Sequence, residues 1–303
     1  MNAVYVDKAM SDDARRKALY DGDLLLYLPT PSVRELVEFT RDMVRQAFNG
    51  ADPEKVQYTM PVEQYAAILA ELKPKFIHHP ESKRLIQGIL RECGCDMEKT
   101  YFDVPRLRTS TSDNYLTTGI AYAFHPHRDT WYSAPLCQIN WWFPVYDIVS
   151  ENGLAFHPNY WNRSVRNGSQ TYNYQEWNKE SRKNAAMHIK TDTRVQPKPE
   201  EPMELEPQLR LVPPVGGIIL FSGAQMHSSV PNTSGKTRFS IDFRTVNFDD
   251  LTNSVGAPNM DSMCTGTTMG DYLRGTDLEH LPEALAERYM AGHPKKAKIL
   301  EAV

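Results

Sequence analysis

The spacing of apolar residues changes near residue 100. Before it, apolar side chains recur three or four positions apart, a spacing typical of helices with one buried face, over residues 31–50, 61–72 and 82–93. Another short helix is predicted over residues 1–20. The apolar run at 24–28, which Pro29 ends, predicts a buried strand. Residues 1–100 are therefore expected to be mostly helical.

After residue 100 the pattern becomes that of strands. Apolar segments bounded by Gly, Pro and Asn predict strands at residues 100–110, 119–127, 136–146, 154–158, 216–222 and 237–244. In the last of these, Phe239, Ile241 and Phe243 alternate with polar side chains, as in a half-buried strand. Helices followed by many strands predict an α+β fold built on one β-sandwich or barrel.

One long stretch, residues 159–208, follows neither spacing. It carries five aromatic residues and then four prolines: Tyr160, Trp161, Tyr172, Tyr174, Trp177, Pro197, Pro199, Pro202 and Pro207. A long insertion of this kind in a compact domain is usually a functional lid or a disordered loop, and the aromatic residues favour a lid. We expect a single domain, 1–303, with its core at 101–250, this insertion at 159–208, and a C-terminal extension at 251–303 that ends in a helix over 279–291.

Composition narrows the class of protein. The 303 residues are 41% hydrophobic and 24% charged, as in ordinary globular proteins, and the formal net charge is −4. No dense run of Lys or Arg suggests a nucleic-acid or membrane surface. The N-terminus resembles no secretory signal, and the four cysteines form no zinc-binding pattern. A cytoplasmic protein with a small-molecule partner is expected, and its oligomeric state is not predicted.

The segment His125–Trp131 carries the candidate chemistry. In an extended strand, the side chains of His127 and Asp129 point to the same face and can bind one ion. His227, at a Gly-rich turn after a predicted core strand, supplies a third ligand. Two histidines and one carboxylate suit non-haem Fe(II) and leave coordination positions open. His125 shares the face of His127, so a set of three histidines is an alternative, although Pro126 would strain a strand interior.

A candidate clamp for a carboxylate lies on the strand after His227. Arg238 and Ser240 share one face of that strand, where a guanidinium and a hydroxyl can hold a carboxylate together. A metal triad beside such a clamp is what a chelating 2-oxo acid requires. Gln138 and Asn140 alternate on one face of the strand at 136–146 and are candidates for contact with the 2-oxo acid or the substrate.

These residues together resemble the Fe(II)/2-oxoglutarate-dependent oxygenases, most closely the phytanoyl-CoA hydroxylase-like group. The resemblance covers about residues 20–247 and includes the segment Asn152–Pro158 and the run from His227 through Pro231-Asn232 to Arg238. It implies a double-stranded β-helix, or jelly roll, supported by the N-terminal helices. It also implies that His127, Asp129 and His227 bind Fe(II) and that Arg238, helped by Ser240, binds 2-oxoglutarate. O2 would be the cosubstrate, and ascorbate would support activity.

The implied activity is oxidation of an unactivated C–H bond of a small molecule by hydroxylation, desaturation or oxidative cyclisation, with specialised metabolism as the suggested setting. Asp129 argues against halogenation, because related halogenases carry a small residue in its place. Substrate contacts are predicted at Trp131, His157, Trp161 and Arg244. Two alternatives stay open: a jelly-roll protein that binds metal or ligand without turnover, and a three-histidine cupin dioxygenase that needs no 2-oxoglutarate.

Overall fold

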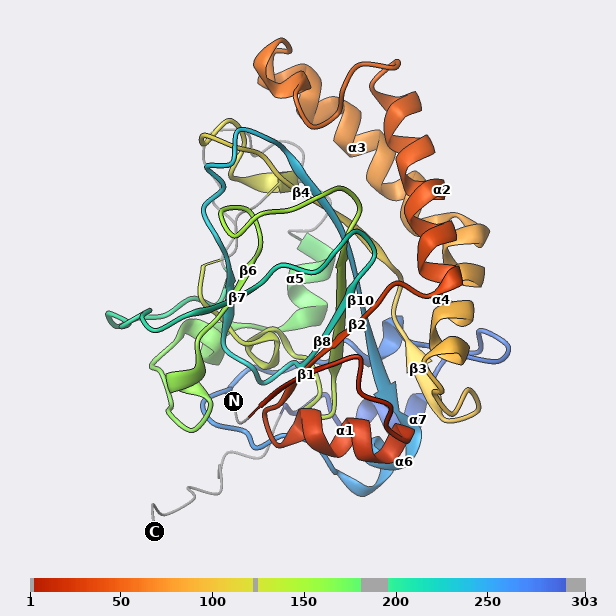
Figure 1. Ribbon diagram of the computed structural model, residues 1–303. Coiled ribbons are helices and arrows are strands. Elements are labelled where there is room, and N and C mark those ends of the chain that lie inside the picture. The colour runs from red at the N-terminus through yellow and green to blue at the C-terminus, as the bar shows by residue number, and fades with distance from the viewer. Residues whose placement is uncertain (1–2, 122–124, 181–195, 293–303) are drawn as a thin grey trace.

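The computed structural model describes residues 3–121, 125–180 and 196–292 of the chain. Helices come first along the sequence and strands dominate after them, so the protein mixes helices and sheets as the apolar pattern predicts (Figure 1). Within the described residues, no helix has both the length and the hydropathy needed to cross a bilayer.

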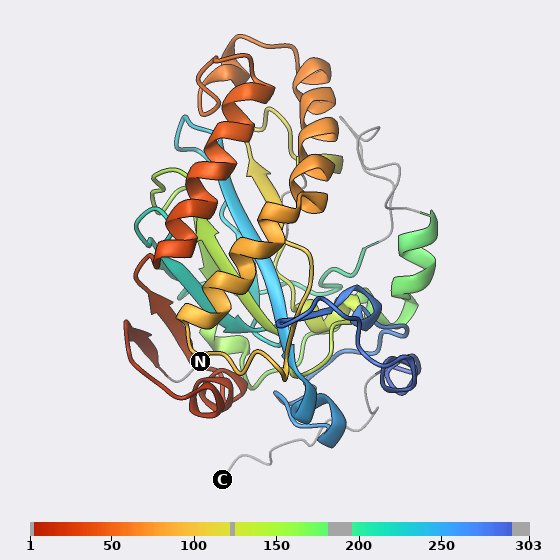
Figure 2. The same ribbon diagram turned by 90° about the vertical axis from the view of Figure 1, so that its right-hand side faces the viewer.

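The N-terminal region forms a helical layer over one face of a large sheet. Its helices are α1 (Asp12–Tyr20), α2 (Pro31–Ala47), α3 (Val62–His78) and α4 (Pro80–Glu92), with strands β1 (Val4–Val6) and β2 (Leu24–Tyr27) before and between them. Figure 2 shows α2, α3 and α4 lying across the sheet. Pro31 stands in the first turn of α2, where its missing N–H is tolerated. The three predicted amphipathic helices are confirmed, and α3 is longer than predicted.

The strands form two sheets. The large sheet has the order β1-β2-β8-β5-β10-β3-β11, with β4 also paired to β10, and the small sheet has the order β7-β6-β9. Their bounds are β3 (Thr100–Phe102), β4 (Arg106–Ser110), β5 (Ile139–Pro144), β6 (Leu154–Phe156), β7 (Leu209–Leu211), β8 (Ile218–Ser222), β9 (His227–Ser229), β10 (Arg238–Asn247) and β11 (Leu273–Arg274). An apolar cluster joins the two sheets, with Trp142 and Phe221 from the large one and Leu154 and Phe156 from the small one. The two sheets therefore pack against each other.

Strand β10 separates two environments. Phe239, Ile241 and Phe243 pack in the main core with residues of the helical layer. The alternate positions, which include Arg238 and Asp242, face the other way, toward the space between the sheets. The predicted alternation is confirmed, but its polar face lies inside the molecule and not in solvent.

Two predicted strands and two predicted helices differ from the structure. Of the helix expected at 1–20 only α1, which begins at Asp12, is found, and β1 precedes it. The strand expected at 100–110 is two strands, β3 and β4, separated by a segment that contains Pro105. The strand expected at 119–127 is not found in its described parts: Gly119–Ala121 is a 3-10 helix, and His127 makes only an isolated bridge after Pro126. Residues 122–124 of that prediction lie outside the described residues. The helix expected at 279–291 shrinks to α7 (Glu283–Glu287), which starts after Pro282.

The remaining helical elements are short. They are α5 (Tyr174–Glu180), α6 (Phe248–Asn253) and the 3-10 helices η1 (Val56–Tyr58), η3 (Asp129–Tyr132), η4 (Pro158–Tyr160), η5 (Gly168–Thr171) and η7 (Met269–Asp271). Three of them, η4, η5 and α5, lie within or at the start of the predicted insertion at 159–208. The described part of this insertion is therefore folded onto the body.

Trp161 fixes the start of the insertion to the N-terminal strand. Its ring is buried in the main core and lies against Gly22, which has a positive φ of +94°. A Cβ atom on Gly22 would come within 2.4–2.7 Å of the indole ring. The turn before β2 therefore requires glycine both for its backbone conformation and for this contact.

We expect Gly22→Ala to lower the free energy of unfolding by about 2–4 kcal/mol, because an overpacked side chain adds to the cost of a positive φ. Gly50 is the matched control: its φ is +79°, and nothing lies within 4 Å of the place that a Cβ atom would occupy. Gly50→Ala should cost only about 1–2 kcal/mol. Urea unfolding of the two variants measures the difference, and equal losses would contradict the packing role of Trp161.

Candidate active site

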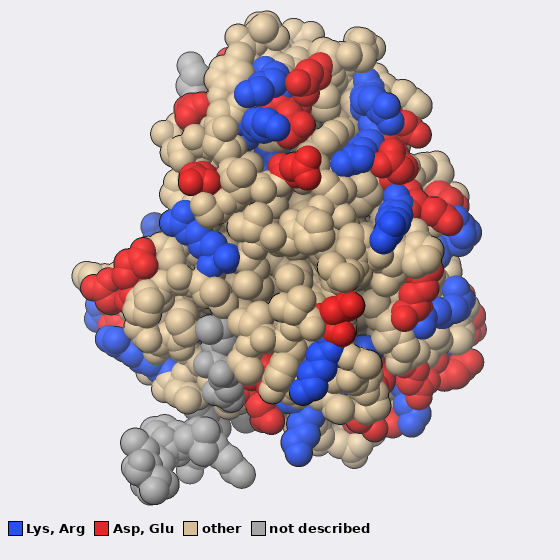
Figure 3. Space-filling view, in the orientation of Figure 1, with Lys and Arg blue, Asp and Glu red and all other residues tan. Residues whose placement is uncertain are grey.

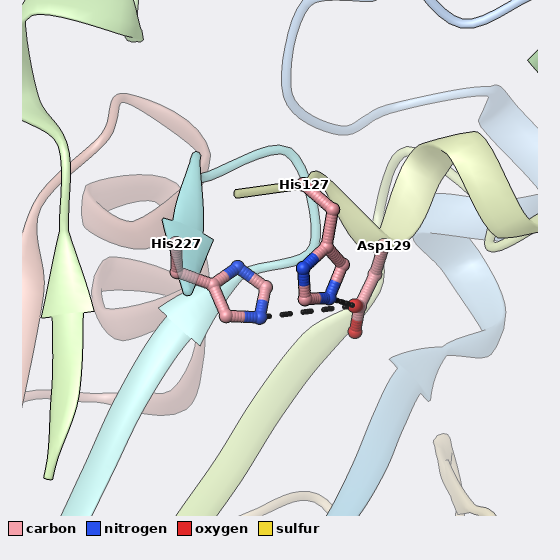
Figure 4. Close-up of side chains that lie close together, drawn as sticks. All are labelled: His127, Asp129 and His227. Carbon is pink, nitrogen blue, oxygen red and sulfur yellow. Dashed lines mark ion pairs between the residues drawn. The ribbon is translucent and has the colours of Figure 1, made fainter. Parts of the chain in front are cut away.

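His127, Asp129 and His227 come together at one end of the small sheet (Figure 4). The backbones of His127 and His227 form an antiparallel bridge, with N···O distances of 2.9 and 3.0 Å. Asp129 follows after one extended residue and begins η3. One oxygen of Asp129, Oδ1, lies 3.4 Å from Nε2 of His127 and 3.9 Å from Nε2 of His227. The ligand atoms of the three residues all lie within 4.8 Å of one another.

Backbone carbonyls orient both imidazole rings. Nδ1 of His127 lies 2.8 Å from the carbonyl oxygen of His125, and Nδ1 of His227 lies 2.9 Å from that of Gln225. A carbonyl only accepts hydrogen bonds, so each Nδ1 carries the proton. In the neutral form of each ring Nε2 carries the lone pair and lies on the side of Asp129, as in metal sites whose histidines are oriented by their second nitrogen.

The protonation states suit a divalent cation. Burial, helped by the nearby His127, lowers the pKa of His227 to about 4, so this ring is neutral at pH 7. Burial alone would raise the pKa of Asp129, but the hydrogen bond and charge of His127 and the charge of His227 hold it well below the usual range. Neutral imidazoles and an ionised carboxylate are the forms in which these side chains bind metals.

A hydrogen-bond relay fixes the second oxygen of Asp129. Nε2 of Gln138 donates to Oδ2 of Asp129 at 2.9 Å and also to Oδ1 of Asn140 at 2.8 Å. The hydroxyl of Tyr272, which is fully buried, donates to Oε1 of Gln138 at 2.8 Å. Gln138 thus orients a candidate metal ligand, a contact that its sequence position did not predict. Tyr272 comes from the C-terminal extension, where no motif pointed to it.

The triad opens into a cavity of about 380 Å³ between the two sheets, which is within the size range of small-molecule sites. The insertion supplies an aromatic part of its wall, with Tyr172, Tyr174 and Trp177. Gln138 and Asn140 line the cavity as well. The expected lid therefore contributes directly to the site.

Arg238 lies in this cavity as a buried guanidinium group. Its NH1 atom donates to the carbonyl oxygens of Asn152 and Gly153 at 2.7 and 3.0 Å, while its Nε atom has no hydrogen-bond partner among the described residues. The guanidinium carbon lies 5.5 Å from the ring centre of Trp142. Burial lowers the pKa of Arg238 to about 10. No ion pair among the described residues involves this side chain, so it is suited to bind an anion from outside the chain.

Ser240 and Arg244, two further predicted site residues, differ in their relation to the cavity. Ser240 has a fully buried hydroxyl that lacks a partner among the described residues, but the residue does not border the cavity. Arg244 does border it and pairs with Asp103 at 3.0 Å and Asp242 at 3.3 Å.

Trp131, His157 and Trp161 are not among the described residues that line the cavity. Trp131 is fully buried and donates to Asp261 at 2.7 Å. His157 lies 3.0 Å from the hydroxyl of Ser228. All three side chains are held by other parts of the protein.

His125 does not join the metal ligands. Its Nε2 atom lies 2.8 Å from the carbonyl oxygen of Pro197, and its ring stands edge-on to that of His127 with 6.2 Å between ring centres. Among the described residues, the only group of metal-binding side chains found is His127, Asp129 and His227. This geometry disfavours the three-histidine alternative.

The sequence matches no protein-family profile and no curated protein. Similar solved structures include EvdO2 from Micromonospora carbonacea var. aurantiaca, at 13% identity over 79% of this chain and 92% of that chain, with a TM-score of 0.44. The α-ketoglutarate-dependent carbocyclase SnoK from nogalamycin biosynthesis matches at 10% identity, 78% and 84% coverage and a TM-score of 0.39. The epimerase SnoN, solved with Fe3+, α-ketoglutarate and nogalamycin RO, matches at 11% identity over 78% of this chain and 85% of that chain, with a TM-score of 0.38. At such values the likeness assigns no reaction to this chain.

We expect His127→Ala, Asp129→Ala and His227→Ala each to abolish stoichiometric binding of Fe(II) or Co(II), because each removes one of three converging ligands. His125→Ala is the matched control and should retain the metal. Metal content after dialysis, measured by mass spectrometry, checks this. Loss of metal from His125→Ala with retention in Asp129→Ala would favour the three-histidine set.

We expect Gln138→Leu to weaken metal binding roughly 10- to 100-fold, since residues that orient a metal ligand have effects of this size. Tyr272→Phe removes only the hydroxyl that holds Gln138, so its effect should be smaller and in the same direction. Calorimetric titration with Co(II) measures both. Unchanged affinity in Gln138→Leu would show that Asp129 needs no such support.

Proposed function

We propose that the protein is an Fe(II)- and 2-oxoglutarate-dependent oxygenase that oxidises an unactivated C–H bond of a small molecule. The observation that carries this proposal is one cavity that holds both a two-histidine, one-carboxylate group and a buried guanidinium without a carboxylate partner among the described residues. The first feature suits iron with open coordination positions. The second suits the distal carboxylate of a dicarboxylic 2-oxo acid.

The residues present fit both groups. His127, Asp129 and His227 would hold the iron. Arg238 would bind the far carboxylate of 2-oxoglutarate, and its unpaired Nε atom fits the two-pronged hydrogen bond that guanidinium groups form with carboxylates. The buried hydroxyl of Ser240 would assist. When bound, iron, 2-oxoglutarate and O2 supply an oxidant able to remove hydrogen from an aliphatic C–H bond, with succinate and CO2 as coproducts.

The side chains of this protein position and shield that chemistry. Gln138 donates a hydrogen bond to Oδ2 of Asp129, which leaves Oδ1, the oxygen beside His127 and His227, as the one that would bind the metal. The aromatic residues of the insertion line the cavity and would limit the access of water to a bound oxidant, which protects it from side reactions. Because Asp129 keeps its carboxylate at the metal, we favour hydroxylation, desaturation or oxidative cyclisation over halogenation.

We also propose that residues 101–250 form a double-stranded β-helix of the phytanoyl-CoA hydroxylase-like group, within one domain of residues 1–303. Support comes from the two packed sheets and from the position of the triad at the end of the small one. All four cysteines are free thiols, as is usual in a reducing compartment, which favours a cytoplasmic location. Specialised metabolism is the setting that we propose for the substrate.

The test of this function is binding and turnover of 2-oxoglutarate. Arg238→Met should raise the dissociation constant for 2-oxoglutarate by roughly 30-fold or more, because truncating one partner of a buried charged pair costs about 2–5 kcal/mol. Metal binding should stay unchanged. Arg210→Met on β7 is the control, since Arg210 is exposed on the small sheet. Calorimetry measures affinity, and succinate release with Fe(II) and ascorbate measures turnover.

Two results would contradict the proposal. If Arg238→Met binds 2-oxoglutarate as tightly as the unmodified chain, this residue is not the clamp. If metal and 2-oxoglutarate bind but neither uncoupled nor substrate-driven succinate release occurs, the alternative of a binding protein without turnover is favoured.

A further inference from the structure

The cavity carries more positive charge than iron and 2-oxoglutarate account for. Among the described residues, the wall has two carboxylates, Asp129 and Asp242, and five cationic side chains: Lys73, Arg106, Arg108, Arg238 and Arg244. Asp129 serves the metal in the proposed function, and Arg238 serves the cosubstrate. Four cations of the wall then remain, with Asp242 as the one carboxylate left beside them on the described wall.

Strand register brings three of these cations together. In the antiparallel pair of β4 and β10, Arg108 stands opposite Ser240 and Arg106 stands opposite Asp242. Directly opposed residues place their side chains on the same face of a sheet. Arg106 and Arg108 therefore share the face of Asp242 and Arg244, which points into the cavity.

Three guanidinium groups share two carboxylates here. Asp103 pairs with Arg106 at 2.5 Å and with Arg244 at 3.0 Å. Asp242 pairs with Arg108 at 2.5 Å and with Arg244 at 3.3 Å. Among the described residues this cluster retains one excess positive charge. The side chain of Arg108 is 37% exposed, so the cluster reaches the mouth of the cavity.

Lys73 adds a further positive charge from helix α3. It is partly buried, and its ammonium group donates a hydrogen bond to the carbonyl oxygen of Ile120. No ion pair among the described residues includes Lys73. Burial and the charge of Arg108 lower its pKa to about 7, so a bound anion would favour its charged form.

This accumulation of positive charge is not a property of the whole protein. The formal net charge is −4, and among the described residues on the face shown in Figure 3 acidic and basic side chains are interspersed. The cavity thus concentrates cations inside an acidic chain. Walls of one sign of charge attract ligands of the opposite sign.

We propose that the substrate is an organic anion, and that its carboxylate or phosphate group binds between Lys73 and Arg108 while its apolar part packs on the aromatic residues of the insertion. The site of oxidation on the substrate would then face the metal from an anchor near the cavity mouth. This inference rests on the proposed function for its chemistry, but the binding of an anion can be tested without turnover.

The test uses three probes of one shape: benzoate, phenyl phosphate and the uncharged benzamide. Each is titrated by calorimetry into the full-length protein loaded with Ni(II) and 2-oxoglutarate, so that Arg238 is already engaged. At least one of the two anions should bind about tenfold or more tightly than benzamide, since a hydrogen bond to a charged group is worth about 1.5–3 kcal/mol. The tighter of the two anions identifies the group that the site prefers.

Lys73→Met and Arg108→Gln should each weaken the binding of the preferred anion about tenfold and leave the affinity for 2-oxoglutarate unchanged. Lys73→Arg should retain binding, because it keeps the charge. Lys75→Met is the matched control on the same helix: Lys75 is exposed, pairs with Glu71 at 3.4 Å and does not border this cavity. Thermal unfolding shows whether each variant is folded, and the comparison of benzoate with benzamide on the unmodified chain needs no variant.

Benzamide binding as tightly as both anions would overturn the inference, as would folded Lys73→Met and Arg108→Gln variants with unchanged anion affinity. The two proposals fail separately. If 2-oxoglutarate binds but the anions bind no more tightly than benzamide, only the proposal of an anionic substrate is overturned. Anion binding at Lys73 and Arg108 in a protein that does not bind 2-oxoglutarate overturns only the oxygenase.

Discussion

The candidate metal site depends on a pair of backbone hydrogen bonds between His127 and His227, two residues far apart in the sequence. Cross-strand neighbours place their side chains on one face, and the two rings stand with 4.3 Å between their centres. A shift of register by one residue would turn His227 to the opposite face and dissolve the site. Asp129 completes the group because Arg128 continues the extended backbone before η3 begins.

Strand β10 connects this centre to the rest of the fold. Its apolar side packs into the helical layer, where the ring of Phe239 stands edge-on to that of Phe48 at 6.4 Å. Its other side carries charges into the space between the sheets, and buried charges are costly without partners. Asp103 and Asp242 meet that need for Arg244, whereas Arg238 has only backbone carbonyls and the ring of Trp142 among the described residues. Arg244 therefore belongs to a network of ion pairs, whereas Arg238 has no carboxylate partner among the described residues.

Segments outside the strands complete the cavity. The insertion brings Tyr172 and Trp177 to its wall, and the carbonyl oxygen of Pro197 accepts a hydrogen bond from Tyr132 at 2.9 Å. The C-terminal extension brings Tyr272 to Gln138, and through it to Asp129. Helix α3 contributes Lys73 to the cavity wall. The chemistry of the site thus uses side chains from every part of the chain, including parts whose sequence pattern is irregular.

Local pattern was enough to predict what depends on neighbours in the sequence. The helical spacing of residues 31–50 and the alternation of Phe239, Ile241 and Phe243 record which face is buried, so those elements formed as expected. The spacing of His127 and Asp129 likewise predicted a shared side, although no continuous strand is found around them among the described residues. The pairing of these two with His227 was a prediction from residue chemistry and resemblance.

Tertiary structure decided what depends on contacts between distant residues. Trp131, His157 and Trp161 look like pocket residues in the sequence, but buried partners elsewhere hold them away from the cavity. Gln138 donates a hydrogen bond to Asp129, a candidate metal ligand. Lys73, which lies beyond the predicted end of its helix, lines the cavity. The sequence by itself determined the elements and the metal-binding residue types, because these follow from local spacing and side-chain chemistry. Only the folded chain decided which polar groups are neutralised and which remain available to a ligand, because that depends on strand register and packing.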